Sequence, residues 1–443
     1  MKYIGLDIGT TTISAAVIDC GASDIPAQPV FYRTVPNNAA LSDADPLRRI
    51  QDPGAIIRTA ADLLDDLLSL YPEVSGIGIT GQQHGILYTD KNGDAVSPLY
   101  TWQDKCADNP FQNETTYAAY LTDISGAMQA SGYGNVTHFY QQSTGCVPQD
   151  AAKYCTVPDY FAMKITGRRV PAADPSMSAS LGMYDLRSGD FMRDVMEKAG
   201  FDLSLLPEKA TAPVIGYYRG IPVTAAIGDN QASFIGGTEA DIKSILVNVG
   251  TGSQISIYTE KYMECSGLET RPFPLGGYLI VGASLCGGRA YALLNKFFEE
   301  TALMLGTDTN DCYANMAALL ERNPKPQNIP VFDTRFQGTR TDPTLKGSIT
   351  GLDANNFHPL HFIYGMLDGI SSELFDMFTL YRDSLSESGS SPLPASLYGS
   401  GGGLRKNPAL IKSFEEHFGL PLHLSAFQEE AASGAAVYAS LVI

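Results

Sequence analysis

The carboxylate of Asp229 lies between a segment predicted as a short apolar strand and a segment predicted as a helix. Asp229 follows the apolar segment 223–228, and small residues typical of a helix start come after it. An aspartate at the carboxyl end of a strand lies where ligand crevices open in α/β sheets. Asp229 is therefore either a general base that orients and deprotonates an attacking hydroxyl in phosphoryl transfer, or the N-cap of the following helix.

A second carboxylate, Asp7, opens a turn that is suited to phosphate. The segment 2–8 is typical of a strand, and it ends in a turn whose hydroxyls come from Thr10, Thr11 and Thr12. Backbone N–H groups at a tight turn bind anions, and threonine hydroxyls add donors. Asp7 alone would repel phosphate, but it can hold Mg²⁺ directly or through water, because Mg²⁺ uses few carboxylates.

The same strand, Gly-Thr turn and strand pattern recurs over residues 244–258, with Gly250 and Thr251 at its turn. The two hairpins are either unrelated or the marks of a duplicated domain, each copy offering its turn to a shared cleft. Helical periodicity at 53–70, and again in the second half, fits α/β layering in both copies. The predicted helices of the second half are 288–305, 358–387 and 407–418. We place the boundary near residue 237, which gives domains 1–237 and 238–443.

A glycine-rich loop at 399–403 has a further use. It follows a strand pattern and precedes a helix with Asn407 as its predicted cap and Pro408 at its first position. A backbone free of side chains lets a flat adenine ring approach closely, although an ordinary strand-to-helix loop is the alternative. The chain contains no G-x-x-x-x-G-K-[ST] sequence, which excludes a P-loop.

Two short polar segments contain side-chain groups of the kinds that bind sugars. The first contains Gln83 and His84, and the second contains Trp102 and Asp104. Amide, imidazole and carboxylate groups supply directional hydrogen bonds, and an indole supplies a flat apolar face. Trp102, the only tryptophan, is either a core residue or a platform for a ligand.

Bulk properties limit the class of protein. A chain of 443 residues exceeds the usual size of one core, so two domains are expected. A formal net charge of −18 argues against nucleic acid or an anionic membrane as partner. The seven cysteines form no C-x-x-C pair and are expected to be scattered thiols. No signal-peptide pattern begins the sequence and its apolar runs are too short to span a bilayer, so a cytoplasmic location is expected.

The order of these motifs along the whole chain resembles the FGGY family of carbohydrate kinases. The resemblance rests on the segments 7–11, 81–85, 102–104, 228–231, 248–253, 401–408 and 429–436. It implies an α/β fold of two duplicated ribonuclease-H/actin-like ATPase domains with an active-site cleft between them, the first binding sugar and the second nucleotide. It also implies ATP and Mg²⁺ as cofactors and a small sugar as the other partner, in a monomer or homodimer.

The resemblance also implies roles for individual residues. Asp229 would be the base and, with Asp7, would hold the metal. Contacts to ATP would come from Thr10, Thr11, Thr12, Gly250, Thr251, Gly287, Gly401, Gly402 and Asn407. Contacts to the sugar would come from Gln83, His84, Trp102, Asp104, Asp159, Asn230 and Asp229 itself.

Within the family, the chain is most similar to the sedoheptulokinases, through residues 81–86, 157–167 and 174–185. It departs from their pattern at Gln83, where Met is usual, and at Leu181, where an aromatic residue is usual. The expected reaction is phosphorylation of a ketose at its terminal primary hydroxyl, with sedoheptulose as the first substrate and xylulose as the alternative. A catalytically silent sugar-binding regulator on the same fold is the rival from another class.

Overall fold

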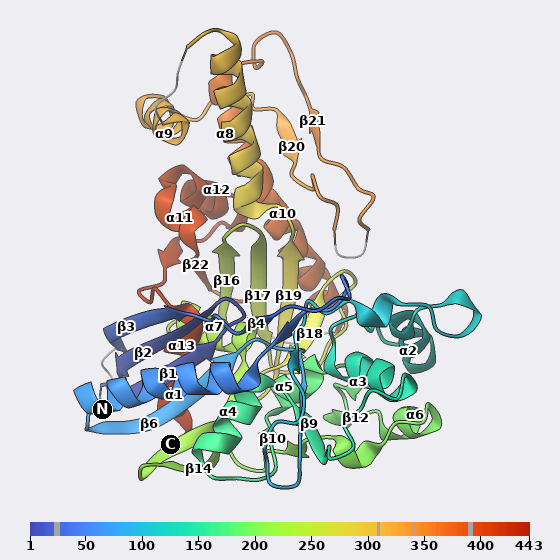
Figure 1. The fold of residues 1–443 in the computed structure, drawn as a ribbon. Helices are drawn as coiled ribbons and strands as arrows, with labels where there is room; N and C mark the ends of the chain where they lie inside the picture. Colours follow the sequence, from blue (N-terminus) through green and yellow to red (C-terminus); the bar gives the residue numbers. More distant parts are fainter. Residues whose placement is uncertain (22–26, 308–310, 340–341, 389–392) are drawn as a thin grey trace. The chain divides into compact units, whose positions relative to one another are not determined.

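The chain folds as two compact units, and each has its own sheet (Figure 1). The computed structural model describes all residues except 22–26, 308–310, 340–341 and 389–392. Unit 2 consists of residues 241–270 and 278–425. Unit 1 consists of residues 1–240, 271–277 and 426–443. The division into 1–237 and 238–443 that we drew from the sequence does not include the two later segments that join unit 1.

The sheet of unit 1 has six strands in the order β14-β15-β6-β1-β2-β3. The central strand β1 runs parallel to β6, and β6 runs parallel to β15, whereas β2 and β3 continue the sheet in antiparallel pairing. Their bounds are Lys2–Ile8 for β1, Thr12–Asp19 for β2, Gln28–Pro36 for β3, Val74–Gly81 for β6, Val214–Tyr218 for β14 and Ile221–Gly228 for β15.

The six-stranded sheet of unit 2 has the order β18-β19-β17-β16-β22-β23. Its central strand β16 is parallel to β22 and antiparallel to β17, so it takes the place that β1 has in unit 1. The bounds are Ser244–Val249 for β16, Ser253–Thr259 for β17, Glu269–Pro272 for β18, Tyr278–Ser284 for β19, Ser396–Ser400 for β22 and Leu422–Leu424 for β23. Five strands of each sheet share this order and these directions, β3-β2-β1-β6-β15 in unit 1 and β19-β17-β16-β22-β23 in unit 2, which confirms the duplication that the two Gly-Thr hairpins predicted.

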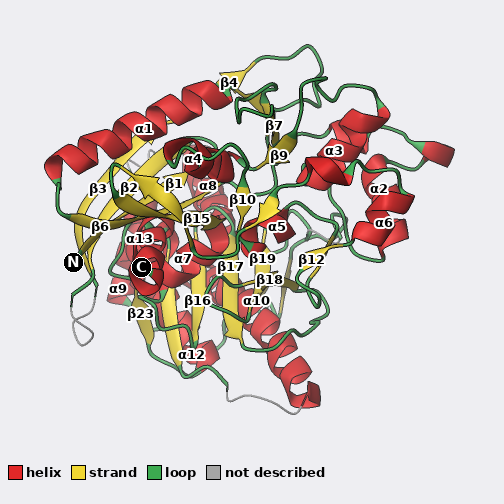
Figure 2. Cartoon of the chain, turned by 90° about the horizontal axis from the view of Figure 1, so that it is seen from below, coloured by secondary structure: helices red, strands yellow, loops and turns green. Residues whose placement is uncertain are grey.

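Helices cover both faces of the unit 1 sheet. α1 (Pro53–Leu70) packs its apolar side on one face, and α13 (Glu430–Val442) covers the other, beside α7 (Asp229–Gly237) (Figure 2). Glycines in the strands let α13 approach closely, because a Cβ on Gly5 would lie 1.8 Å from the Ala432 carbonyl oxygen. A Cβ on Gly78 would lie 1.9 Å from the carbonyl oxygen of Ala435. The last helix is therefore an integral layer of unit 1.

A smaller layer with its own hydrophobic core is inserted into unit 1 after β6. Its helices are α2 (Tyr117–Ser125), α3 (Gly134–Ser143) and α6 (Arg193–Lys198), and aromatic side chains fill the space among them. The short helices α4 (Val157–Ile165) and α5 (Pro175–Ser180) lie between α3 and α6 in the sequence, and both contact β15. The insertion thus carries candidate sugar-reading residues to the edge of the main sheet.

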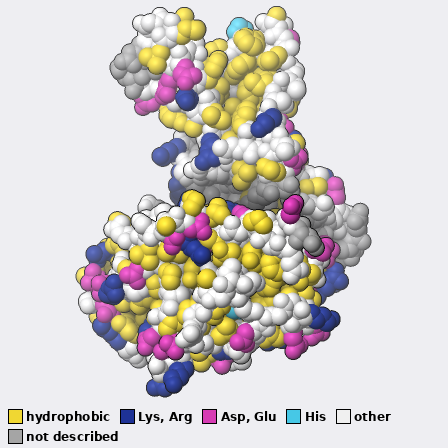
Figure 3. Space-filling model, turned by 45° about the vertical axis from the view of Figure 1, so that its right-hand side comes forward, with side chains coloured by type: hydrophobic (Ala, Val, Ile, Leu, Met, Phe, Trp, Pro, Cys, Tyr) yellow, Lys and Arg dark blue, Asp and Glu magenta, His cyan; other side chains and the backbone are white. Residues whose placement is uncertain are grey.

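In unit 2 the helices are α8 (Gly287–Met304), α9 (Cys312–Arg322), α10 (Pro359–Ser388), α11 (Gly402–Lys406) and α12 (Pro408–Phe418). These bounds confirm the three helices predicted for the second half to within about a residue. Hydrophobic side chains are exposed where α8, β20 (Val331–Asp333) and β21 (Ser348–Thr350) reach the surface, among them Phe297 and Met304 (Figure 3). None of the helices in the described parts of the chain is long and apolar enough to cross a membrane.

Candidate active site

Three parallel strands of unit 1 end in one row. Ile8 of β1 pairs with Gly81 of β6, and Gly81 pairs with Gly228 of β15. Asp7 precedes this row by one residue and Asp229 follows it by one. The carboxyl ends of adjacent parallel strands form the edge at which α/β sheets bind ligands. The fold therefore brings the two predicted carboxylates to the same edge.

Asp229 is not the N-cap of α7. The N-cap is Gly228, and Asp229 is the first helical residue, with its Oδ1 accepting a hydrogen bond of 2.7 Å from the Asn230 N–H. Capping of α7 therefore does not explain why an aspartate stands at position 229. Burial raises the pKa of Asp229, and the nearby guanidinium of Arg271 opposes that rise. The sequence analysis missed Arg271, which reaches this site on the 271–277 segment of unit 1.

Asp7 lies in an environment that favours a cation. Burial raises the pKa of Asp7 to about 7, and the negative charges of Asp229 and Glu429 add to the effect. A divalent cation would relieve this repulsion, so the residues present fit Mg²⁺. The described residues contain no cluster of three or more metal-ligating side chains, but Mg²⁺ is commonly held by one or two carboxylates together with waters and substrate phosphates.

Gln83 and His84 follow β6 and are fixed by α5. Gln83 is buried, and its Nε2 donates to the carbonyl oxygen of Ser176 at 3.2 Å. His84 has a left-handed backbone with φ of 72°, and its ring Nδ1 lies 2.6 Å from the Ser180 carbonyl oxygen. Because a carbonyl oxygen only accepts, Nδ1 must carry the proton in this contact. The His84 ring also stacks on Tyr133, with centroids 4.6 Å apart.

Ser176 connects Gln83 to the strand that carries Asp229. Its hydroxyl oxygen accepts a hydrogen bond of 3.1 Å from the Gly228 N–H, while its carbonyl accepts from Gln83. The hydroxyl donates in turn to Asp174 Oδ1 at 2.6 Å. No sequence signal singled out Ser176, although it lies within the segment 174–185 that carries the family resemblance. Ser176 thus connects Gln83, a predicted sugar contact, to the strand end that precedes Asp229, the predicted base.

Trp102 and Asp104 have different roles in the loop after β8 (Leu99–Tyr100). The Trp102 side chain is 46% exposed, which favours the ligand platform over the core residue. Asp104 is 2% exposed, and its carboxylate accepts from the backbone N–H groups of Arg49 and Cys106 at 3.0 and 3.1 Å. In this conformation the Asp104 carboxylate is not open to a sugar; it fixes the loop that presents Trp102.

Asp159 and Asn230 are also buried. Asp159, in the first turn of α4, is 1% exposed and accepts a hydrogen bond of 2.7 Å from Thr156 Oγ1. Burial raises the pKa of Asp159 to about 8, so this carboxyl is largely protonated at neutral pH and is closed to a ligand. The Oδ1 atoms of Asp159 and Asn230 are both buried and have no hydrogen-bond partner among the described residues, and the neutral amide oxygen of Asn230 can accept from a ligand.

The first Gly-Thr turn joins β1 to β2. Thr11 and Thr12 are exposed at its tip, and both hydroxyls are open to an anion. Thr10 is partly buried, and its hydroxyl is bonded within the protein to Trp102 and Gln82. The three threonines, predicted as a set, therefore do not have equivalent surroundings.

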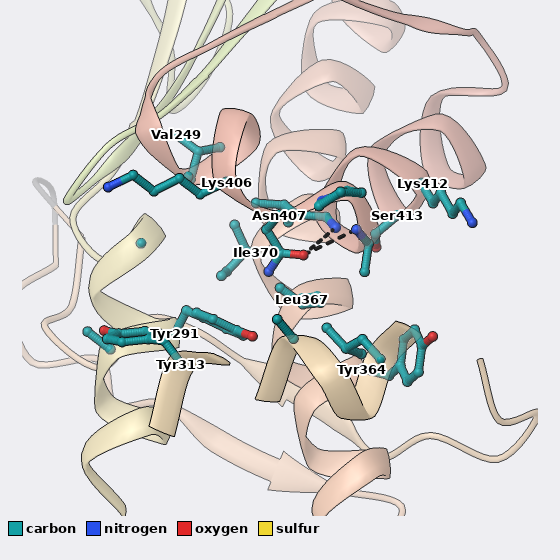
Figure 4. A pocket seen from close by; sticks show the side chains of 18 of the residues that line it. Val249, Tyr291, Tyr313, Tyr364, Leu367, Ile370, Lys406, Asn407, Lys412 and Ser413 are labelled. Carbon is teal, nitrogen blue, oxygen red and sulfur yellow. Dashed lines mark hydrogen bonds between the residues drawn. The ribbon is translucent and has the colours of Figure 1, made fainter. Parts of the chain in front are cut away.

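Unit 2 contains a cavity of about 1280 Å³ that four of the predicted nucleotide residues line: Gly250, Thr251, Gly402 and Asn407 (Figure 4). Gly401 and Gly287 stand just behind its wall. A Cβ on Gly401, whose φ is 89°, would lie 2.6 Å from the Val249 carbonyl oxygen. A Cβ on Gly287 would lie equally close to Gly252. Both glycines permit the close packing that shapes the cavity.

Two tyrosines on one side of the cavity were missed by the sequence analysis. Tyr291 of α8 and Tyr313 of α9 have ring centroids 6.0 Å apart, and both face the cavity opposite Asn407 (Figure 4). Burial raises the pKa of Tyr291 to about 12, although its hydrogen bond with Asn407 acts in the other direction. Asn407 Oδ1 also caps α12, as predicted, by accepting from Ala409 and Leu410. Aromatic faces with a nearby amide can hold a flat heterocyclic base.

Comparison with protein families identifies both halves of the chain. Residues 2–236 match the N-terminal domain of the FGGY family of carbohydrate kinases, and residues 245–442 match the C-terminal domain of the same family. The two matches together span nearly the whole sequence and meet close to the start of unit 2.

Individual carbohydrate kinases are similar to the chain over nearly its whole length. The chain is 26% identical to the sedoheptulokinase of Mus musculus, over 98% of this chain and 96% of that protein. It is 23% identical to the glycerol kinase of Limosilactobacillus reuteri, over 100% of this chain and 90% of that protein. The fold matches the crystal structure of a xylulose kinase from Rhodospirillum rubrum with a TM-score of 0.82, at 21% identity, over 100% of this chain and 90% of that one.

Proposed function

Because this chain belongs to the FGGY family of carbohydrate kinases, and is thus an ATP-dependent sugar kinase, we propose that its acceptor is a ketose phosphorylated at the terminal primary hydroxyl. The ketose that we propose is sedoheptulose, and the product is sedoheptulose 7-phosphate. The observation that carries this choice is the similarity to a sedoheptulokinase over nearly the full length of both proteins. The segments around Gln83 and 174–185 support it, since Gln83 and Ser176 contact Gly228, the residue before the proposed base.

Asp229 is the proposed base. Its carboxylate accepts the proton of the attacking hydroxyl, late in a transition state in which the bond to the leaving oxygen is already largely broken. Its main contribution is to orient that hydroxyl, and the hydrogen bond from the Asn230 N–H at the first turn of α7 helps to fix the partly buried carboxylate. When bound, Mg²⁺ held by Asp7, with Asp229 nearby, would neutralise negative charge on the phosphates.

The proposed sugar contacts fall into two groups. Gln83, His84 and Asn230 read hydroxyls by hydrogen bonds, and Trp102 offers the exposed face of its indole to the carbon chain. Asp104 and Asp159 remain predictions as sugar ligands, but the burial of their carboxyls favours structural roles. A ligand could reach either carboxyl only if the surrounding backbone moved.

The proposed nucleotide site is the cavity of unit 2. Adenosine contacts Gly402 and Asn407, with the Tyr291 and Tyr313 rings beside the base. The backbone of Gly250 and Thr251 is the proposed phosphate contact of this unit, and Thr11 and Thr12 remain the phosphate contacts predicted for unit 1. Gly287 and Gly401 act indirectly by allowing close packing.

A panel of acceptors tests the proposal. Initial rates with Mg·ATP are measured on sedoheptulose, D-xylulose, D-ribulose, D-fructose and glycerol, and kcat/KM is compared. We expect sedoheptulose to exceed every other acceptor by at least about tenfold, which corresponds to about 1.4 kcal/mol of selective transition-state binding. A preference for D-xylulose would make the protein a xylulokinase. Binding of a sugar without any phosphoryl transfer would support the silent regulator instead.

A further inference from the structure

Three residues of unit 1, Thr10, Gln82 and Gln51, form a closed circuit of hydrogen bonds that begins at the hydroxyl of Thr10 and ends at its backbone carbonyl. The Thr10 hydroxyl bonds to Gln82 Oε1 at 3.2 Å, and Gln82 Nε2 bonds to Gln51 Oε1 at 3.0 Å. Gln51 Nε2 then bonds to the carbonyl oxygen of Thr10 at 2.8 Å. Trp102 enters the circuit from outside, with its Nε1 3.0 Å from Thr10 Oγ1.

The direction of every bond in this circuit is determined by one atom. The Thr10 carbonyl oxygen only accepts, so Gln51 must present its amide nitrogen there and its amide oxygen to Gln82. Gln82 therefore donates to Gln51 and presents its own oxygen to Thr10. The Thr10 hydroxyl must donate its single proton to Gln82, and it accepts from the indole of Trp102, which is a donor only.

The circuit is enclosed except at one end. Gln51 and Gln82 are each 4% exposed, whereas the Trp102 side chain is 46% exposed. Thr10 donates its single hydroxyl proton to Gln82, so its hydroxyl does not donate to a phosphate while the circuit is intact. The indole is thus the part of the circuit that a ligand can touch.

We propose that this circuit couples a sugar resting on Trp102 to the phosphate-binding turn at residues 9–12, with Trp102 and Thr10 as its positioning residues. The inference rests on the proposed function, which places the sugar at Trp102 and the phosphates at Thr11 and Thr12. A sugar that restrains the indole strengthens the bond to Thr10 and fixes the turn, so nucleotide binds more tightly when sugar is present. Coupling of two binding equilibria is reciprocal, so nucleotide must also alter the surroundings of Trp102.

The sequence supplies the reporter for this test. Trp102 is the only tryptophan in the chain, so emission excited at 295 nm, where tyrosine scarcely absorbs, reports on Trp102 alone. The unaltered protein is titrated with the Mg²⁺ complex of a non-hydrolysable ATP analogue, with and without sedoheptulose. We expect the analogue alone to change the emission, and the ketose to lower its Kd roughly fivefold, the range expected for one hydrogen bond.

Two substitutions at one position isolate the hydroxyl. Thr10→Val removes it at nearly constant shape and should abolish both the emission change and the effect of sugar on the Kd. Thr10→Ser keeps the hydroxyl and should retain both. Thr59→Val is the matched control, because the Thr59 hydroxyl bonds only to its own helix, at Ala55, within unit 1. Trp102→Phe keeps a flat ring but lacks the N–H and the reporter, so it is tested by kinetics: its KM for ketose should change little, whereas the effect of ketose on its KM for ATP should be lost.

The outcomes separate this inference from the proposed function. If Thr10→Val responds to the analogue as the unaltered protein does, or if the unaltered protein shows no emission change, the inference is wrong even when sedoheptulose is phosphorylated. If no ketose is phosphorylated but the analogue changes the emission only where residue 10 carries a hydroxyl, the circuit stands and the proposed substrate does not.

Discussion

The side chain of Gln83 occupies the space that a side chain on Gly228 would need. A Cβ on Gly228 would lie 2.2 Å from Gln83 Nε2, and equally close to Gln231 Oε1. Gln83, a proposed sugar contact, and the strand end that carries the proposed base are thus in direct contact. Any displacement of one is expected to move the other.

Gly228→Ala should therefore lower activity without a large loss of stability. The backbone of Gly228 (φ −60°, ψ 144°) is ordinary for alanine, so the effect arises from the displaced Gln83 and not from strain in the chain. We expect kcat/KM for the ketose to fall about 10²-fold, the usual consequence of a misplacement of about 1 Å. Steady-state kinetics and a thermal unfolding curve measure the two effects.

The control for this substitution is Gly54→Ala. An added Cβ there lies 3.2 Å from the flexible end of the Arg58 side chain and 3.2 Å from Oδ1 of the capping residue Asp52, in a helix where alanine is favourable. If Gly54→Ala and Gly228→Ala have the same kcat/KM, the contact between Gln83 and Gly228 does not position the site.

Asp229→Asn should abolish most of the activity while leaving the fold at least as stable. Loss of a positioned base lowers rates by about 10²–10⁴-fold. Because burial raises the pKa of Asp229, its ionised form is unfavourable in the native state, and the neutral amide removes that penalty. Turnover and denaturant midpoint at pH 7 are the two measurements. A variant that stays within tenfold of the parent rate would show that Asp229 is not the base.

Asp159 predicts a dependence of stability on pH. Its pKa is raised to about 8 in the folded protein from an ordinary value of 3.8. A carboxyl with a raised pKa favours the folded state below the unfolded pKa, and that contribution is lost as the pH rises through the folded pKa. Between about pH 4 and 8 the free energy of unfolding should fall by at most about 1.4 kcal/mol per pH unit from this group.

Asp159→Asn should remove that part of the pH dependence. Urea unfolding of both proteins at pH 5, 6, 7 and 8 gives the difference, in which other titrating groups cancel. The amide oxygen can still accept from Thr156, so the variant should fold and should keep its KM for the ketose. A KM raised tenfold would instead return Asp159 to the set of sugar ligands.

Asn407→Asp separates helix capping from nucleotide binding. A carboxylate caps α12 as well as an amide does, so the free energy of unfolding should change by less than about 0.5 kcal/mol. The substitution removes the amide N–H donors and adds a negative charge to the cavity wall, so the KM for ATP should rise about tenfold. Asn407→Ala, which loses the cap as well, should also be less stable by about 1 kcal/mol. An unchanged KM for ATP in both variants would remove Asn407 from the nucleotide site.

The sequence predicted those features that local patterns determine. The two Gly-Thr hairpins, α1, α12 and the cap at Asn407 follow from strand alternation, helical periodicity and turn chemistry. The alternatives for Asp229 could not be separated in this way, because a cap and a first-turn residue differ by one position and by one hydrogen bond.

What local patterns could not predict depends on distant contacts. Arg271 reaches Asp229, and Ser176 holds Gln83, only because segments far apart in the chain meet at one sheet edge. Tyr291 and Tyr313 lie on different helices, and nothing in the sequence of either helix marks a ligand-facing ring. Asp104 and Asp159 carry the right chemistry for sugar, but their burial is a property of the folded insertion alone.

The place of α13 in unit 1 affects how the protein is synthesised. Its helix covers strands β1 and β6, yet α13 itself is made more than 340 residues after β6. The glycine-lined face of that sheet therefore lacks α13 while the residues between β6 and α13 are made, and unit 1 cannot finish folding before α13 has been synthesised. Since contacts that span such distances in sequence form slowly, the nascent chain has an extended period in which a chaperone must shield this face or aggregation competes with folding.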